Sequence, residues 1–252
     1  MSRVLAVANQ KGGVGKTTTA INLGAALAAL ERRVLLVDCD PQGNATRGLG
    51  VEVEAPHLYH VLAGEADLTD AVRATGLEGL EIVPSSRDLV GAEVELADVD
   101  AWQHVLERRI EPLRERYHTI LLDCPPSLGR LTVNALTAAD GVLVPLQCEY
   151  FALEGISELA QTVERVRAAA NPGLAITGIL LTMYDERTNL SKDVADEIRR
   201  HFGARVYRTV VPRNVRLAEA PSHGLPALLY DIKSSGSQAY LALARELLGR
   251  AA

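Results

Sequence analysis

The chain has 252 residues, 48% of them hydrophobic, which is enough for one large domain with a substantial core. Its formal net charge of -6 at pH 7 excludes a protein that binds nucleic acid through an overall basic surface, but it leaves room for a local basic patch. The three cysteines have no paired or zinc-binding spacing, and no apolar run approaches the roughly 20 residues of a membrane-spanning helix. The composition predicts a single domain over residues 1–252 in a reducing cytoplasm.

Short apolar runs alternate with longer helical patterns along the chain. The runs that predict strands are residues 4–8, 34–38, 80–84, 120–123, 142–146, 176–182 and 206–211. Helical periodicity follows the first run directly and recurs at residues 153–170, 190–202 and about 237–250. Because the strands are apolar throughout, they indicate an α/β fold whose doubly wound, mostly parallel sheet is covered by helices on both faces. Residues 50–75 are the least regular stretch, and we expect them to form a surface excursion.

The stretch NQKGGVGKTTTAINL, residues 9–23, joins the first strand to the first helix, which is where a phosphate-binding loop lies. Its glycines let the backbone turn its N–H groups toward phosphate oxygens, and the helix N-terminus adds a partial positive charge. We expect Lys16 to reach the β- and γ-phosphates, Thr17 to ligate Mg²⁺ and Thr18 to bond a further phosphate oxygen. The predicted cofactors are ATP or ADP with Mg²⁺, and the predicted contacts in this loop are Lys11, Gly12, Gly13, Val14, Gly15, Lys16, Thr17 and Thr18.

The loop departs from the standard pattern G-x-x-x-x-G-K-[ST], because Gln10 stands at its first position and an extra lysine, Lys11, follows. The string KGGVGKT resembles the deviant Walker A ATPases, which include ParA, MinD, the nitrogenase iron protein and the arsenite-pump ATPase. This resemblance implies that Lys11 reaches across a dimer interface to the nucleotide of the other subunit. Its effect would parallel that of an arginine finger, about 10³–10⁵ in rate. The spacing alone is equally compatible with a lysine that only solvates the mouth of the loop.

Three aspartates follow predicted strands, at the edge where α/β sheets bind their ligands. Asp123 ends TILLD and is expected to hold Mg²⁺ through a water molecule. Asp38 and Asp40 lie in VDCDPQGN, and alternation along the chain puts them on the same side. A carboxylate beside the γ-phosphate can position the attacking water; the family gives this role to the second aspartate, hence Asp40, while Asp38 is assigned to the Mg²⁺ water shell. Either residue could instead cap the turn that follows it.

These expectations give a catalytic set and a metal set. The predicted catalytic residues are Asp40, Lys11 and Lys16, and the predicted metal-site residues are Thr17, Asp38 and Asp123.

Further strings along nearly the whole chain resemble the ParA/Soj chromosome-partitioning ATPases. They are DCDPQGNAT, DCPPSLGRLTVNAL, VPLQCEYFALEG, LLTMYDERTNL and VPRNVRLAEAPSHG. The resemblance implies that the chain hydrolyses ATP and that adenine lies near Met183, Pro212 and Asn214. The Asn214 amide has the donor and acceptor that pair with adenine, although a residue following Pro212 can also serve only as a turn residue.

ParA/Soj proteins bind DNA without sequence preference as ATP-bound sandwich homodimers, and a ParB-like centromere-binding partner stimulates their otherwise slow hydrolysis. The resemblance implies the same here, with a nucleoid-associated location in the cytoplasm. Residues 187–233 contain nine Lys and Arg, a dense run for an acidic protein. The family points first to Arg187 and Arg216 as DNA contacts, while the alternative for each is an ordinary solvated helix face.

Other functions of the wider family are less well supported. A MinD-like positioning ATPase would carry a basic amphipathic C-terminal helix, whereas RELLGRAA resembles the end of a packed helix, so we expect no membrane partner. An iron–sulfur electron donor needs two cysteines per subunit in contexts that Cys39, Cys124 and Cys148 do not occupy. A nucleotide-dependent regulator of replication initiation is compatible with the ParA-type interpretation as a second role.

Overall fold

The computed structural model describes residues 2–150 and 152–250. Its centre is an eight-stranded sheet in the order β3-β4-β2-β5-β1-β6-β7-β8. The strands are β1 (Arg3–Val7), β2 (Val34–Asp38), β3 (Arg73–Ala74), β4 (Leu80–Val83), β5 (Thr119–Asp123), β6 (Gly141–Gln147), β7 (Ile176–Tyr184) and β8 (Val206–Pro212). All neighbouring strands are parallel except β3 and β4, which are antiparallel. The mostly parallel sheet predicted from the apolar runs is confirmed.

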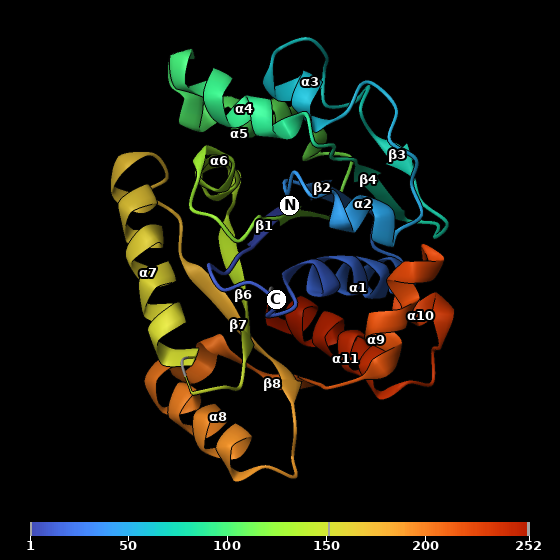
Figure 1. Cartoon of the computed structure of the whole chain (residues 1–252), viewed down its shortest axis with the longest axis vertical. Helices are drawn as coiled ribbons and strands as arrows, with labels where there is room; N and C mark the ends of the chain where they lie inside the picture. The colour runs from blue at the N-terminus through green and yellow to red at the C-terminus, as the bar shows by residue number, and fades with distance from the viewer. Residues whose placement is uncertain (1, 151, 251–252) are drawn as a thin grey trace.

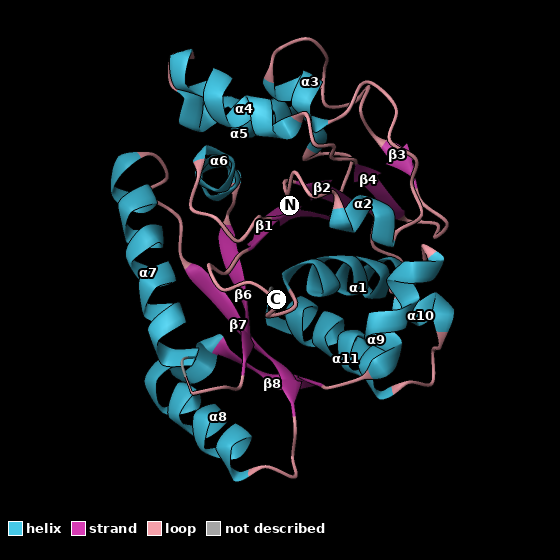
Figure 2. Cartoon of the chain, in the orientation of Figure 1, coloured by secondary structure: helices cyan, strands magenta, loops and turns pink. Residues whose placement is uncertain are grey.

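Helices cover both faces of this sheet (Figures 1 and 2). The α-helices are α1 (Lys16–Ala29), α2 (Asn44–Gly48), α3 (Leu58–Leu62), α4 (Leu89–Glu95), α5 (Val105–Ile110), α6 (Arg130–Ala138), α7 (Ala152–Ala169), α8 (Asn189–Phe202), α9 (Val215–Glu219), α10 (Ala227–Tyr230) and α11 (Ser235–Arg250). Short 3₁₀ helices separate some of them: η1 (Leu96–Asp98), η2 (Trp102–His104), η3 (Glu111–Leu113), η4 (Gly203–Arg205) and η5 (Ala220–His223). None of the described helices combines the length and apolarity needed to cross a membrane.

The two faces of β1 show why its sequence is apolar throughout. Val4 and Ala6 pack with helices α3 to α8, while Leu5 and Val7 pack with α1 and α11. Successive side chains of a strand point to opposite faces, so a sheet covered on both sides needs an apolar residue at every position. Full burial of a leucine side chain contributes about 1.5–3 kcal/mol. The doubly wound arrangement therefore follows directly from the uninterrupted apolar runs.

The predicted elements end within two residues of the observed ones, but several elements were not predicted. Helices α2, α3, α4, α5, α6, α9 and α10 have four to nine residues each. A helix of one or two turns offers too few positions for a period of 3.6 residues to be distinguished from chance. Tertiary packing rather than local periodicity sets these short helices.

The expectation of a surface excursion over residues 50–75 was correct only in part, because residues 52–55 and 63–65 are exposed but other positions are not. Apolar side chains of this segment are buried in the core beside α4 and α5: Leu58, Val61, Leu62, Leu68 and Ala71. The segment also supplies β3, which adds the antiparallel edge to the sheet. The sequence of this segment does not reveal these buried positions, because a five-residue helix and a two-residue strand leave almost no periodic signal.

The parallel register brings acidic residues together at one edge of the sheet. Asp38 ends β2 and Asp123 ends β5, and these two residues are direct partners in the β2–β5 pair. Val7 at the end of β1 is the partner of Asp123 on its other side, and the loop toward α1 begins just beyond it. The fold thus places the glycine loop and two buried carboxylates at the edge where parallel α/β sheets bind ligands.

A close approach between β7 and β8 generates a test of this packing. Gly178 of β7 faces the Tyr207 ring of β8 so closely that a methyl group at Gly178 would overlap the ring. Tyr207 is buried, and the Arg250 guanidinium lies 4.0 Å from its ring centre, so movement of the ring would disturb both contacts. We expect Gly178→Ala to lower the free energy of unfolding by about 1–3 kcal/mol, measured by urea denaturation.

The matched control is Gly155→Ala in α7, where a methyl group would meet no atom within 4 Å. A helix-interior glycine replaced by alanine should raise stability by about 0.5–1 kcal/mol. Equal effects of the two substitutions would contradict the packing described for Gly178.

Candidate functional site

The glycine loop between β1 and α1 has the backbone of an anion-binding turn. Gly13 and Gly15 have φ angles of 75° and 89°, a left-handed region that residues with a side chain rarely adopt. Gly15 is the N-cap of α1, and because it has no side chain it cannot cap the N–H groups of the first turn. The first turn of the helix therefore presents donors and a positive dipole end to a phosphate.

Two buried side chains from outside the phosphate-contacting set hold this loop. Asn9 Nδ2 donates to the Pro145 carbonyl at 2.8 Å, and Asn9 Oδ1 accepts from the Lys11 N–H at 3.0 Å. On the other side, Thr182 Oγ1 donates to the Val14 carbonyl at 2.8 Å. The sequence analysis missed both residues, although Asn9 directly precedes the loop and Thr182 lies at a predicted strand end.

The two lysines of the loop occupy different environments. Lys16 is buried, and its Nζ donates to the Lys11 carbonyl at 3.1 Å. Burial lowers the pKa of Lys16, while Asp123 opposes that shift. The Lys11 side chain is 40% exposed at the rim, and its Nζ lies 3.1 Å from Glu149 Oε2 of the same chain. Lys16 thus points into the loop, whereas Lys11 is bound to an acidic partner that the sequence analysis missed.

Asp123 is a buried carboxylate that lacks a partner. Its exposed fraction is 0%, and neither of its oxygens has a hydrogen bond of acceptable geometry within residues 2–150 and 152–250. Burial first, and then the charge of Asp38, raises the pKa of Asp123 well above the usual carboxyl range, although the nearby Thr17 hydroxyl and Lys16 oppose that shift. Because an unpaired buried charge is costly, this position fits a bound cation.

The donor set around Asp123 suits Mg²⁺ rather than a metal held by protein ligands alone. No group of three or more His, Cys, Asp or Glu side chains among the described residues is arranged as a metal cage. Mg²⁺ usually takes one or two protein oxygens, phosphate oxygens and several waters. Asp123 and the Thr17 hydroxyl lie close enough to interact, and they stay the predicted source of those protein oxygens.

Asp38 and Asp40 are both engaged by the turn that follows β2. Asp38 Oδ2 accepts from the Thr46 N–H at 2.9 Å and from Thr46 Oγ1 at 2.7 Å, and burial raises the pKa of Asp38 to about 6. Asp40 Oδ1 accepts from the Gln42 N–H at 2.9 Å. Both carboxylates therefore cap backbone N–H groups, as the alternative interpretation allowed, and their roles toward Mg²⁺ and water stay predictions.

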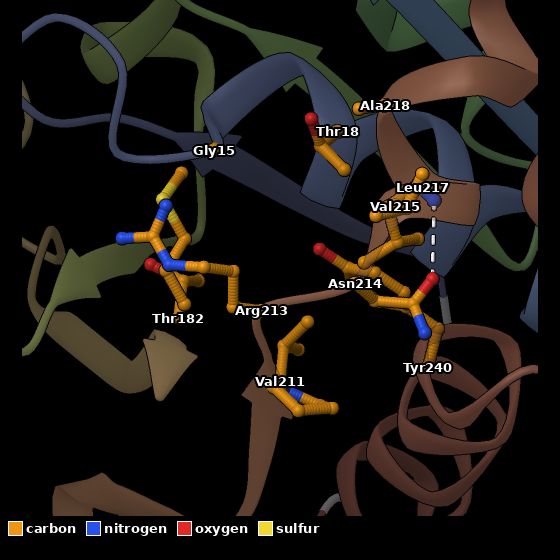
Figure 3. A pocket seen from close by; sticks show the side chains of 12 residues that line it. Gly15, Thr18, Thr182, Val211, Arg213, Asn214, Val215, Leu217, Ala218 and Tyr240 are labelled. Carbon is orange, nitrogen blue, oxygen red and sulfur yellow. Dashed lines mark hydrogen bonds between the residues drawn. The ribbon is translucent and has the colours of Figure 1, made fainter. Parts of the chain in front are cut away.

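A cavity of about 390 Å³ lies next to the loop, between α1, β7, β8 and α9 (Figure 3). Met183, Pro212 and Asn214 all line it, together with Gly15 and Thr18 of the loop and α1. Most of its remaining lining is apolar, from Val211, Val215, Leu217, Ala218 and Tyr240. The three residues predicted to surround a base are thus brought into one pocket that is continuous with the phosphate loop.

Asn214 already has hydrogen-bond partners in this pocket. Its Oδ1 accepts from the N–H groups of Arg216 at 2.9 Å and Leu217 at 3.3 Å, so it caps α9 (Figure 3). Its Nδ2 donates to Ser235 Oγ at 2.8 Å. Asn214 thus caps a helix, a role that the sequence analysis did not name, and a pairing of its amide with adenine stays a prediction.

The two arginines predicted to contact DNA lie outside this cavity, on separate segments. Arg187, in the loop between β7 and α8, is 87% exposed and lies 2.7 Å from Asp185. Arg216 of α9 is 49% exposed; it lies 2.7 Å from Glu219 and 3.5 Å from Asp231. Both arginines are accessible, and both are paired with carboxylates of their own chain.

Comparison with known proteins places the chain in a family. Residues 2–176 match the AAA domain family AAA_31. Over 252 residues the chain is 58% identical to the chromosome partitioning protein ParA of Caulobacter vibrioides strain NA1000 / CB15N, covering 98% of this chain and 94% of that protein. The sporulation initiation inhibitor protein Soj of Bacillus subtilis strain 168 is 52% identical, with 98% of each chain covered. The chain belongs to the ParA/Soj family of chromosome-partitioning ATPases.

The fold of this ParA/Soj chain agrees with a solved structure. The cobyrinic acid a,c-diamide synthase of Mycobacterium smegmatis, solved with bound ADP and magnesium, is 40% identical and has a TM-score of 0.86, with 98% of this chain and 94% of that chain covered. The family expected from the quoted strings is confirmed, as is the doubly wound P-loop fold. The ADP and magnesium of that neighbour are the cofactor classes predicted for this ParA/Soj chain.

The unpaired carboxylate generates the prediction for this site. Asp123→Asn removes a buried charge, so we expect the ligand-free chain to gain about 1–3 kcal/mol of stability. The gain should be larger at pH 8 than at pH 5, because a raised pKa makes the wild type lose stability as pH rises through it. The additional stabilisation that Mg²⁺ gives in the presence of ADP should disappear. Urea denaturation with and without Mg²⁺ and ADP measures both effects.

The control is Asp67→Asn, whose side chain is 79% exposed and whose stability should change by less than about 0.5 kcal/mol. A ligand-free Asp123→Asn protein that is less stable than the wild type would refute the unpaired-charge description.

Proposed function

We propose that this chain is a nucleotide-switched DNA-binding ATPase that acts in chromosome segregation. Two copies close face to face on ATP, and the closed homodimer binds duplex DNA without sequence preference. A ParB-like centromere-binding protein stimulates hydrolysis and so releases the DNA. The observation that carries this proposal is Lys11, a second lysine beside a complete phosphate loop, which sits at the rim with 40% of its side chain exposed.

The chemistry divides between the two copies. Lys16 and the first turn of α1 hold the phosphates of the chain's own nucleotide, and Asp40 orients the attacking water. Thr17 and Asp123 would hold Mg²⁺, with Asp38 in its water shell, and the ion would supply positive charge toward the phosphates. Lys11 leaves Glu149 and supplies a positive charge to the nucleotide of the other copy. Basal turnover is slow because one chain alone lacks this charge.

The electrostatics of the late segment support DNA as the output of the switch. Residues 187–233 hold nine Lys and Arg but five Asp and Glu, although the whole chain carries a net charge of -6. Arg187 and Arg216 are the proposed contacts to the phosphates of the DNA backbone, and a homodimer carries two copies of each. Binding would therefore require ATP and would place the protein on the nucleoid.

The MinD-like alternative has less support. The apolar residues of α11, including Tyr240, Leu243 and Leu247, are buried against the sheet and α1, so this helix has no free apolar face to lay on lipid. An iron–sulfur role is likewise disfavoured, because Cys39, Cys124 and Cys148 are all buried and burial raises the pKa of each thiol.

The experiment that tests the proposal is retardation of a random-sequence duplex with no nucleotide, with ADP and with ATP. We expect retardation with ATP but not with ADP or without nucleotide. If four phosphates are neutralised, the logarithm of the DNA-binding constant should fall with the logarithm of the salt concentration with a slope of about -3.6. Arg216→Ala should keep ATP-driven dimerisation and weaken DNA binding, because it removes a phosphate contact from each copy.

Arg167→Ala is the matched control, since Arg167 is also partly exposed and paired within its own helix, to Glu164, but lies outside residues 187–233. Equal retardation with ADP and ATP would refute the switch. Normal DNA affinity of the Arg216→Ala protein would remove only that residue from the contact set.

Asp40 provides a separate prediction for the hydrolytic step. Asp40→Ala should trap an ATP-bound dimer that stays on DNA, because the water is no longer oriented while the nucleotide contacts remain. Light scattering with ATP measures the dimer, and phosphate release measures turnover. A variant that stays monomeric with ATP would show that Asp40 serves dimer formation instead.

A further inference from the structure

The Val14 carbonyl in the phosphate loop has a single long-range anchor. Val14 is 1% exposed, and its carbonyl accepts a hydrogen bond of 2.8 Å from the Thr182 hydroxyl, 168 residues away in sequence. Thr182 is itself 2% exposed and lies near the end of β7. A buried carbonyl without this partner would cost about 1–3 kcal/mol, so the hydroxyl strongly favours one orientation of the Val14–Gly15 peptide.

The planarity of the peptide makes this anchor relevant to phosphate binding. In a trans peptide the carbonyl and the following N–H point in opposite directions. When Thr182 holds the Val14 carbonyl on one side of the loop, the Gly15 N–H must face the other side. No hydrogen bond within the described parts of the chain uses the Gly15 N–H. This donor is therefore oriented and available.

We propose that Thr182 is a positioning residue for nucleotide binding, whose hydroxyl fixes the Val14–Gly15 peptide so that the Gly15 N–H faces the phosphate. Thr182 acts through the loop backbone and makes no phosphate contact itself. The inference concerns nucleotide binding alone, so it does not depend on dimerisation, DNA or a partner protein.

The same strand end also reaches the base pocket. Thr182 and Met183 both line the cavity of about 390 Å³, and Met183 has a φ of 49°. A methionine in the left-handed region is unusual, and such conformations persist where surrounding contacts hold them in place. The backbone carbonyl of Tyr184 accepts a hydrogen bond from the Arg213 N–H at 3.2 Å. Three consecutive residues of β7 thus touch the phosphate loop, the base pocket and the segment that leads into α9.

The test uses Thr182→Val, which keeps the side-chain shape and removes the hydroxyl. We expect the affinity for ADP, measured by isothermal titration, to fall by on the order of tenfold, because the Gly15 N–H is no longer held toward the phosphate. Adenosine has no phosphate, so its affinity, measured by ligand-observed NMR, should change less than about twofold. A role in stability alone would not separate these two ligands.

Two further variants keep the test decisive. Thr182→Ser retains the hydroxyl and should bind ADP within about twofold of the wild type. Thr177→Val removes a similar hydroxyl–carbonyl hydrogen bond, to Val142 at 3.3 Å, at the other end of the same strand, and should leave ADP affinity unchanged.

The proposal is overturned by unchanged ADP affinity in Thr182→Val, by equal losses of ADP and adenosine, or by an equal effect of Thr177→Val. If the Thr182→Val protein does not fold, the Thr182→Ser protein provides the test. A tenfold loss of ADP affinity in the serine variant, although its hydroxyl is retained, would also overturn the proposal. Failure of DNA binding in the wild type would leave all of these ADP measurements interpretable.

Discussion

The site depends on one constraint, which is that two carboxyl groups are buried next to each other and away from water. The parallel register makes Asp38 and Asp123 cross-strand partners, and both are fully buried. Asp38 is compensated by three hydrogen bonds, two from Thr46 and one from the Asp40 N–H, whereas Asp123 has none of acceptable geometry in the described chain. Burial raises the pKa of both carboxyl groups, so their ionised forms need positive charge nearby. Lys16 provides part of that charge, and a bound cation would provide the rest.

The phosphate loop is the positive counterpart of these carboxylates. It is held from both sides, by Asn9 attached to β6 and by Thr182 of β7, so its donors are oriented before any ligand arrives. Donors that need no reorganisation interact more favourably with phosphate charge than mobile ones do. Lys11 is the exception, since it lies at the rim and is paired with Glu149. The loop therefore combines donors that are held from both sides with a cation that is partly exposed at its rim.

The loop after β2 is also joined physically to the C-terminal segment that carries Arg216. Asp38 binds Thr46 of α2, and the turn after α2 meets the turn after η5, where Gly50 and Gly224 are in backbone contact. Both glycines have φ angles in the left-handed region, 66° and 65°, and a side chain on Gly224 would overlap the Gly50 backbone. Two glycines are thus required for two distant segments of the chain to touch at this point.

The sequence by itself determined seven of the eight described strands, their burial on both faces, the phosphate loop and the residues that lie at the carboxyl edge of the sheet. Continuous apolar runs and a glycine-rich string are local features, so they can be read without knowing what lies opposite them. Only the tertiary structure decided that the apolar side chains between residues 58 and 71 are buried, that Asn214 caps α9, that Lys11 is paired with Glu149 and that Thr182 holds Val14. The burial of a residue and the identity of its hydrogen-bond partner depend on residues up to 168 positions away. No local sequence pattern indicates which polar side chains will contact one another.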